Sequence, residues 1–118
     1  MSVVIGAKGL EEVTLVIPQS TSLTFDVIHE DENGEAIDHS QSTAKMAFQT
    51  KDKSRTWHMD ECCTCTSEKI RVTIPANITE SLPVSKLVWD LFAITTLGEQ
   101  IRLCFGDVQM ADTYAMDE

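Results

Sequence analysis

The sequence is short of positive charge and has no long apolar stretch. It holds nine lysines and arginines against nineteen aspartates and glutamates, which gives a formal net charge of −10. Nucleic-acid backbones and anionic lipid surfaces bind concentrated basic side chains, so this charge argues against both partners. The sequence contains no run of about 20 apolar residues, which is the length that a transmembrane helix requires. The first residues, MSVVIGAKGLEEV, lack the features of a secretion signal, so we expect a protein that is made in the cytoplasm and is either kept there or assembled into a particle from there.

Catalytic signatures are also missing. No serine lies between glycines as in a nucleophile elbow, and the three histidines are scattered with no nucleophile beside them. No internal repeat, low-complexity tract or long linker divides the sequence, so we expect one domain over residues 1–118. Residues 1–10 and 111–118 have weak internal patterning and are expected to form flexible arms.

The sequence is rich in β-branched residues and in short alternating segments. Val, Ile and Thr occupy 31 positions and favour a pleated sheet. Apolar alternation or short apolar runs predict strands at residues 12–17, 21–28, 43–49, 69–74, 86–94 and 100–105. Turns are predicted at Asn33-Gly34 and at residues 95–99, and a helical turn at residues 77–82, where Asn77 and Glu80 have capping-box spacing. Together these predict an all-β, immunoglobulin-like, two-sheet β-sandwich of about seven or eight short antiparallel strands.

Alternation also predicts which side chains face the core. Two such sets are Ala44, Met46 and Phe48, and Ile70, Val72 and Ile74. Trp89 is expected in the core because apolar residues flank it. Leu103 and Phe105 are expected to point inward, which would place Cys104 on the outer side of its strand.

Several segments of the sequence resemble one family. They are SLTFDV, the Asn33-Gly34 turn, IRVTIP, VWDLFAI and IRLCFGDVQM, with Trp89-Asp90-Leu91, Gly98 and Gly106 as the most specific pieces. In this order they resemble the small β-sandwich domains that tailed bacteriophages use as accessory virion proteins, such as the N-terminal domain of phage upper baseplate proteins. The resemblance covers residues 21–111. The cysteine-rich segment and the Ser40-Gln41-Ser42 bend depart from that pattern.

The resemblance implies a non-enzymatic structural protein of the virion that needs no cofactor. Its expected partners are other virion proteins, either major capsid or tail proteins, bound by many copies of the chain. Capsid decoration is the favoured hypothesis, and a small neck, tail or baseplate component is the alternative. A carbohydrate-binding module is a further alternative. It would need two or three aromatic side chains on one exposed face, and only Trp57 and Tyr114 qualify.

Trp57 is the candidate contact residue for a partner. It lies in the polar run KDKSRTWHMDE, so we expect it to be partly exposed. Aromatic side chains dominate the energetics of protein interfaces. Trp57 is therefore the predicted anchor.

The cysteines are the remaining candidates for chemistry. Cys62 and Cys65 have the spacing of a zinc knuckle or a redox pair, and Cys104 and His58 could complete a set of ligands. A second ligand pair is missing, and the flanking acidic residues oppose thiolate formation. We therefore favour free thiols over a disulfide, a zinc site or a redox enzyme.

Five acidic residues between positions 30 and 38 form the densest charge in the sequence. Such a cluster could bind calcium, but Gly34 is misplaced for a calcium loop. A solvated hairpin loop is the favoured interpretation.

Overall fold

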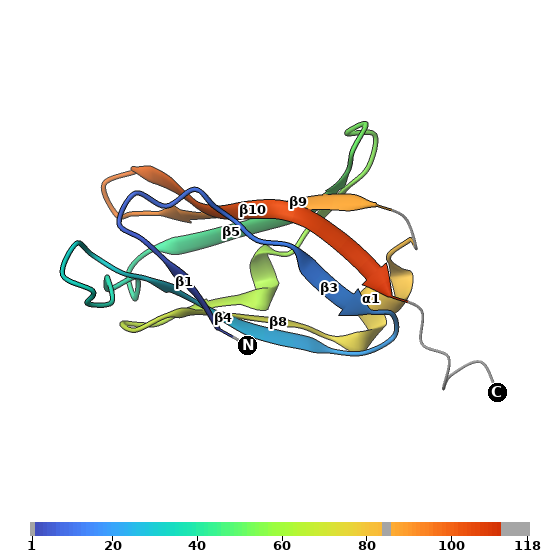
Figure 1. Cartoon of the computed structure of the whole chain (residues 1–118), viewed down its shortest axis with the longest axis horizontal. Helices are drawn as coiled ribbons and strands as arrows, with labels where there is room; N and C mark the ends of the chain where they lie inside the picture. Colours follow the sequence, from blue (N-terminus) through green and yellow to red (C-terminus); the bar gives the residue numbers. More distant parts are fainter. Residues whose placement is uncertain (1, 84–85, 112–118) are drawn as a thin grey trace.

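The computed structural model describes residues 2–83 and 86–111 (Figure 1). These residues contain ten strands and two short helices. One sheet has four strands, in the order β1 (Ser2–Ile5), β4 (Leu23–His29), β8 (Ile70–Ile74) and β7 (Cys63–Cys65). The other has six, in the order β2 (Glu11–Glu12), β10 (Gln100–Ala111), β9 (Leu87–Ile94), β5 (Thr43–Thr50) and β6 (Thr56–His58), with β3 (Leu15–Pro18) also paired to β10. The helices are a 3-10 turn, η1 (Asp60–Cys62), and α1 (Ala76–Ser81).

The two sheets pack face to face, which confirms the predicted all-β, two-sheet sandwich, although with ten strands in the described residues instead of seven or eight (Figure 1). The prediction of purely antiparallel pairing is wrong for the N-terminal strands. β1 runs parallel to β4, and β2 and β3 run parallel to β10, whereas the remaining pairs are antiparallel. Parallel neighbours require a long connection. Here the chain between β1 and β4 supplies it by crossing to the other sheet and back.

The inward side chains of the two sheets form one buried cluster. Both predicted core sets, from β5 and β8, are buried, which confirms the alternation in these strands. Trp89 is also buried, as predicted, and its ring meets Phe25 edge-on with the centroids 5.9 Å apart. Edge-to-face pairs are a favoured aromatic geometry, so this contact fixes the two sheets against each other.

The N-terminal segment is part of the sandwich, although residues 1–10 were expected to form an arm. Ile5 at the end of β1 is fully buried, and a turn from Gly6 to Gly9 then leads the chain toward the other sheet. Leu10 donates its N–H to the carbonyl of Arg102 on β10. The segment therefore closes one side of the sandwich. The other expected arm, beyond Ala111, lies outside the described residues.

Strand β10 contains an irregularity that reverses one prediction. The pairing with β9 shifts by one residue between Arg102 and Cys104, so Leu103 is the extra residue of a β-bulge. Leu103 and Cys104 are both fully buried, whereas Phe105 faces outward and is only partly buried. The prediction that Cys104 faces outward and Phe105 inward is wrong, because a bulge interrupts the two-residue alternation.

The predicted turns are present. Thr95 and Glu99 close the β9–β10 hairpin through a backbone hydrogen bond of 2.9 Å, and Gly98 has a φ of 82°. Gly34 has a φ of 81° and donates its N–H to the carbonyl of Asp31. Glycine adopts such positive φ values without strain, which explains its place in both turns.

The short helix is present, but its predicted cap is wrong. The N-cap of α1 is Pro75, and no side chain caps the helix, because Asn77 already lies inside the first turn. Thr79 instead fastens α1 to the sandwich by donating its hydroxyl hydrogen to the carbonyl of Thr21. At six residues, α1 is far too short to cross a bilayer, and the described residues contain no helix that could do so.

Candidate functional site

The central strand of the six-stranded sheet is apolar on both faces. Along β9 the inward side chains are buried, and the outward ones, which are partly buried, are Val88, Asp90, Phe92 and Ile94. Three of these four outward side chains are therefore apolar. A solvent-facing position of an antiparallel strand normally carries a polar residue. The outer surface of β9 is thus suited to being covered.

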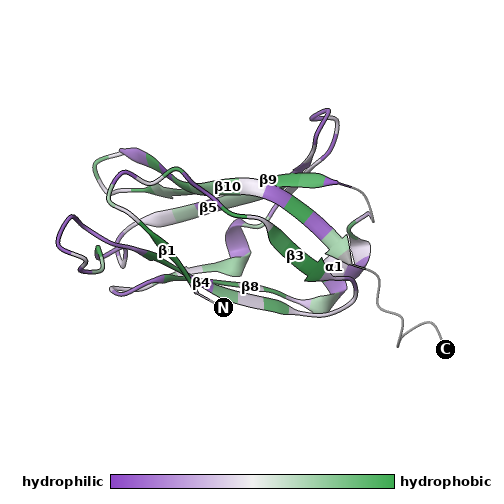
Figure 2. Cartoon of the chain, viewed as in Figure 1, coloured by the Kyte–Doolittle hydropathy of each residue, from purple (hydrophilic) through white to green (hydrophobic). Residues whose placement is uncertain are grey.

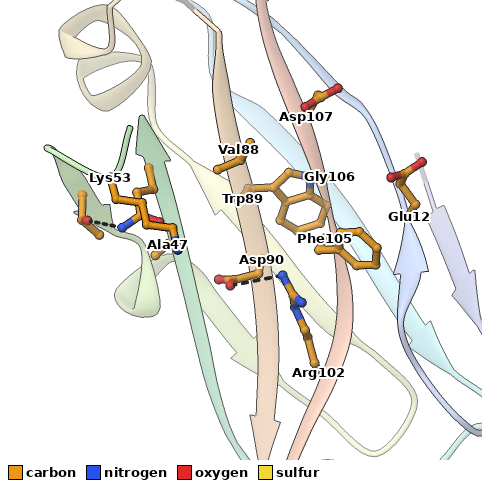
Figure 3. A pocket seen from close by; sticks show the side chains of 12 residues that line it. Glu12, Ala47, Lys53, Val88, Trp89, Asp90, Arg102, Phe105, Gly106 and Asp107 are labelled. Carbon is orange, nitrogen blue, oxygen red and sulfur yellow. Dashed lines mark hydrogen bonds and ion pairs between the residues drawn. The ribbon is translucent and has the colours of Figure 1, made fainter. Parts of the chain in front are cut away.

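Neighbouring strands extend this surface into a shallow groove of about 590 Å³ (Figure 3). We call the surface the groove face and define it by the outward side chains Ala47, Gln49, Val88, Asp90, Phe92, Arg102, Phe105 and Asp107. Glu12 lies at one side of the groove and Lys53, on the β5–β6 hairpin, at the other. The floor is aromatic and aliphatic, and the rim carries both signs of charge.

Arg102 is the central charged group of the groove face. Its guanidinium carbon lies 4.7 Å from the ring centre of Phe105 and 6.0 Å from that of Phe92, both within the range of a cation–π contact. Its Nη2 lies 3.8 Å from a carboxylate oxygen of Asp90 (Figure 3). One basic side chain therefore organises two aromatic rings and one carboxylate, without covering the far end of the groove near Val88.

The segment between β2 and β3 is hydrogen-bonded to β9 and β10, the strands whose outward side chains form most of the groove face. The carbonyl of Val13 accepts a 2.9 Å hydrogen bond from Nε1 of Trp89, and its N–H donates to the carbonyl of Phe105 at 2.7 Å. A side chain at Gly106 would collide with that same Val13 carbonyl. Glycine at 106 therefore lets the backbone of Val13 approach β10 closely.

The outer face of the four-stranded sheet has a different composition. We call it the polar face and define it by the outward side chains Thr24, Asp26, Thr64, Arg71 and Thr73. Nε and Nη2 of Arg71 donate to the two carboxylate oxygens of Asp26 at 2.8 and 3.3 Å, and Lys69 lies 3.3 Å from the same carboxylate. The hydrogen bond from Arg71 lowers the pKa of Asp26 to about 2. Among the described residues of this sheet, the apolar side chains that face outward are Val4 and Ile28, which are paired at the β1 edge.

Trp57, the predicted contact anchor, lies outside the groove. It is on the edge strand β6, opposite the buried Phe48, so its side chain points toward the core and is partly buried there. The guanidinium carbon of Arg55 lies 4.6 Å from the indole ring centre. The expected partial exposure is therefore present, and the contact role stays a prediction. Tyr114 lies outside the described residues.

The structure does not bring the candidate cysteines together as ligands. Cys62 ends η1, Cys65 faces the interior from β7, and Cys104 is buried on β10 of the other sheet. All four cysteines lie in the described part of the chain, and none forms a disulfide there. Within residues 2–83 and 86–111, no three His, Cys, Asp or Glu side chains converge to hold a metal ion.

The thiols are held in their protonated form. Burial raises the pKa of Cys63 and that of Cys104 to about 12 each, with nearby thiols and carboxylates adding to the effect. Burial also raises the pKa of Cys62 and Cys65, and Glu61 raises that of Cys62 further. The thiolate is the nucleophile and the metal ligand, so the raised pKa values oppose both roles; Cys104 is buried, and the other three thiols are partly exposed.

The acidic segment forms a hydrogen-bonded loop between β4 and β5. Oδ1 of Asp31 accepts the N–H groups of Asn33 at 2.8 Å and of Glu35 at 3.0 Å. This carboxylate therefore organises a turn, as in the predicted hairpin loop. The loop is among the most hydrophilic segments of the chain, together with the β5–β6 hairpin at the opposite end (Figure 2).

Sequence reasoning missed the groove face. Phe92 and Arg102 had no predicted role, Phe105 was expected to point inward, and β6 was not predicted as a strand. One signal could have found the face: the run KLVWDLFAI is apolar at nearly every position, which indicates a strand covered on both sides.

Comparison with protein-family models gives no match. No curated protein matches the sequence. Among solved structures, the N-terminal domain of ORF48 of phage TP901-1 has a similar fold, with a TM-score of 0.54 and 8% sequence identity. The similarity covers 92% of this chain and 95% of that one. This likeness concerns the fold alone, and at that level it confirms the predicted resemblance to a phage domain. Over nearly its whole length, the chain has the fold of a domain from a phage protein.

Proposed function

We propose that this chain is a non-enzymatic structural protein of a bacteriophage particle, which docks through the groove face onto a neighbouring virion protein. The observation that carries the proposal is the composition of the groove face. Val88, Phe92 and Phe105 point outward from two adjacent strands of a sheet in a phage-type sandwich. Partly exposed apolar side chains within a charged rim are typical of a protein interface.

The chemistry of the groove face favours a particular kind of partner surface. An extended segment with apolar side chains would fill the space over Val88 and Phe105. The rim itself is balanced in charge, because Lys51 lies 3.9 Å from Asp107 and Lys53 stands across the groove from Glu12. The net charge of −10 of the whole chain is what favours a partner that carries basic side chains around its apolar residues.

Within the particle, the proposed location is the capsid exterior, as a decoration subunit on the major capsid protein. A neck, tail or baseplate position is the alternative. Mass spectrometry of purified particles with copy-number estimation distinguishes them. Hundreds of copies per particle would support the capsid, whereas about six to twelve would support a ring in the neck or baseplate. Absence of the chain from purified particles would overturn the whole proposal.

The docking face is tested by adding purified chain to particles that lack it and measuring co-sedimentation. The double variant Val88→Thr/Phe105→Thr makes the groove polar while keeping residues that favour strands. We expect its affinity for the particles to fall by about tenfold or more. Thermal unfolding would verify that the variant is folded.

A matched control exchanges side chains on the opposite sheet. Thr24→Val/Thr73→Val alters two paired positions of the polar face, and we expect it to co-sediment like the unmodified chain. Equal binding by both double variants would refute docking through the groove face while leaving the virion assignment open to the copy-number measurement.

Sugar binding is a second candidate, because two aromatic rings share one outer face. Phe92 and Phe105 take the place that Trp57 and Tyr114 were expected to fill, and Asp90 and Gln49 supply polar groups nearby. Arg102 already lies against both rings, so this candidate ranks below docking. Chemical-shift changes at these residues on adding simple sugars would favour it.

A further inference from the structure

Two histidines are buried together where the N-terminal segment meets the sandwich. His29 is the last residue of β4, and His39 lies in the bend that leads into β5; each is 3% exposed. Their rings are nearly parallel, with an angle of 14° between them and centroids 5.2 Å apart, and they meet edge to edge, with Nδ1 of His29 2.9 Å from Nε2 of His39. Neither ring lies in the groove, so the proposed docking function does not account for the pair.

The hydrogen bonds of the pair define where its protons are. Nε2 of His29 lies 3.1 Å from the carbonyl of Ala7, which can only accept, so His29 carries its hydrogen on Nε2. Its Nδ1 must then accept from Nε2–H of His39. That leaves Nδ1 of His39 to accept from the hydroxyl of Ser42, 2.9 Å away. Every nitrogen is satisfied when both rings are neutral.

This chain of hydrogen bonds fastens β1. Ala7 lies in the turn that follows β1, and Ile5 pairs with His29 in the parallel ladder. The N–H of Glu30 also donates to the carbonyl of Ile5. Beyond the turn, Gly9 and Leu10 have φ values of 68° and 60° and lead to the separate contacts with β10. The contacts of residues 2–7 can therefore open without opening those of β2 and β3.

An added proton disrupts the arrangement. On Nδ1 of His29 it would point at Nε2–H of His39, so two donors would oppose each other. On Nδ1 of His39 it would place a positive charge in the interior. We propose that the His29–His39 pair is a proton-sensitive latch, and that its protonation releases residues 2–9 from β4 while the rest of the described sandwich stays folded.

The charged groups around the pair do not cancel this effect. On the N-terminal side, Lys8 follows Ala7 in the turn and is exposed. Glu30, the first residue after the end of β4, is partly buried. Burial lowers the pKa of His39, a positive charge on the neighbouring His29 would lower it further, and the charge of Asp38 raises it by less. The closed state therefore favours the neutral form of His39, and it loses stability as the pH falls below the ordinary histidine value.

Release would open the edge of β4. The backbone of β4 next to β1 would lose its partner, and an unpaired strand edge can accept a strand from another chain. Ile5 would leave the core, which opposes opening at neutral pH. Acid thus acts against a closed state that apolar burial otherwise favours.

The test is amide hydrogen exchange of the full chain between about pH 7.5 and about pH 5. One histidine that titrates normally only after release shifts the opening equilibrium by about thirtyfold over this range. We expect the protection factors of residues 3–9 to fall by about that factor, and those of β5 and β9 to stay constant. Equal protection at both pH values would overturn the latch, and so would loss of protection throughout the sandwich at once.

Variants separate the pair from other effects of acid. His29→Gln/His39→Gln keeps amide donors near both positions but cannot titrate, so residues 3–9 should show the same protection at both pH values. His58→Gln, at an exposed position on β6, should respond to pH like the unmodified chain. A second readout does not depend on any variant. Nitrogen chemical shifts of the unmodified protein should report Nε2–H tautomers for both rings at neutral pH, and an Nδ1–H tautomer on either ring would overturn the proposal.

Discussion

The two outer faces of the sandwich differ in the polarity of their outward side chains. On the polar face the outward side chains of β4 and β8 include Thr24, Thr73 and the ion pair of Asp26 with Arg71. On the groove face the outward side chains of β9 are mostly apolar. The charged one among them, Asp90, pairs with Arg102 of β10. Both sheets have equally buried inner faces. The difference therefore lies in the outward side chains, and it is the basis of the proposal that the groove face is the one that docks.

The largest effect is expected where the groove face is most closely packed. A Cβ at position 106 would collide with the carbonyl of Val13, so Gly106→Ala must push the segment between β2 and β3 away from β10. That movement also breaks the hydrogen bond from Trp89. We expect the free energy of unfolding to fall by about 3 kcal/mol, measured by urea denaturation.

The control for this change is Gly6→Ala. A Cβ there meets no atom within 4 Å, and its φ is not positive. We expect a change of less than about 0.5 kcal/mol. If Gly106→Ala were as mild as Gly6→Ala, the close approach of Val13 would not be what supports the groove face.

The same contrast explains which parts of the fold could be predicted from the sequence. In strands such as β8, buried and exposed side chains alternate strictly, so their core residues could be predicted from spacing alone. Strands β6 and β7 have three residues each, too few for a period to be visible. The bulge at Leu103 lies within the run Leu-Cys-Phe, where every residue is apolar. The sequence therefore gave no sign that the alternation of inward and outward side chains shifts there by one residue. The parallel pairing of β1 depends on contacts with residues more than 20 positions away, which no local pattern encodes.

The candidate site was harder to predict because its residues are defined by facing outward. Phe105 was expected to point inward and Phe92 had no assignment, and only the alternation of β9 and the bulge in β10 place both on the outer face. The histidine pair also gave no signal, since His39 lies in a polar bend of the sequence. Burial of such a residue depends on the N-terminal turn that packs over it.

A smaller effect tests whether Arg102 organises the groove. Arg102→Met keeps an aliphatic side chain over Phe105 but removes the charge that contacts both rings and Asp90. Because these groups are partly exposed, we expect a loss of only about 1 kcal/mol in the free energy of unfolding. A double-mutant cycle with Asp90→Asn should give a coupling of about 0.5 kcal/mol, decreasing in high salt. Zero coupling would mean that the ion pair contributes nothing and that the aromatic contacts alone position Arg102.

The smallest effect lies on the polar face, where the ion pair of Asp26 with Arg71 lies at the surface and Arg71 is half exposed. The pKa of Asp26 is lowered from 3.8 to about 2, and the hydrogen bond from Arg71 contributes more to this lowering than the one from Lys69. Since the folded value lies below the unfolded one, the contribution of this carboxylate is present above about pH 4 and is lost as the pH falls toward about 2. In Arg71→Gln, a carboxyl titration by NMR should show the pKa of Asp26 rising toward 3.8, with Lys69 still holding it below that value. An unchanged pKa would mean that Lys69 carries the interaction, and a pKa near 3.8 in the unmodified chain would remove the ion pair from the contrast between the two faces.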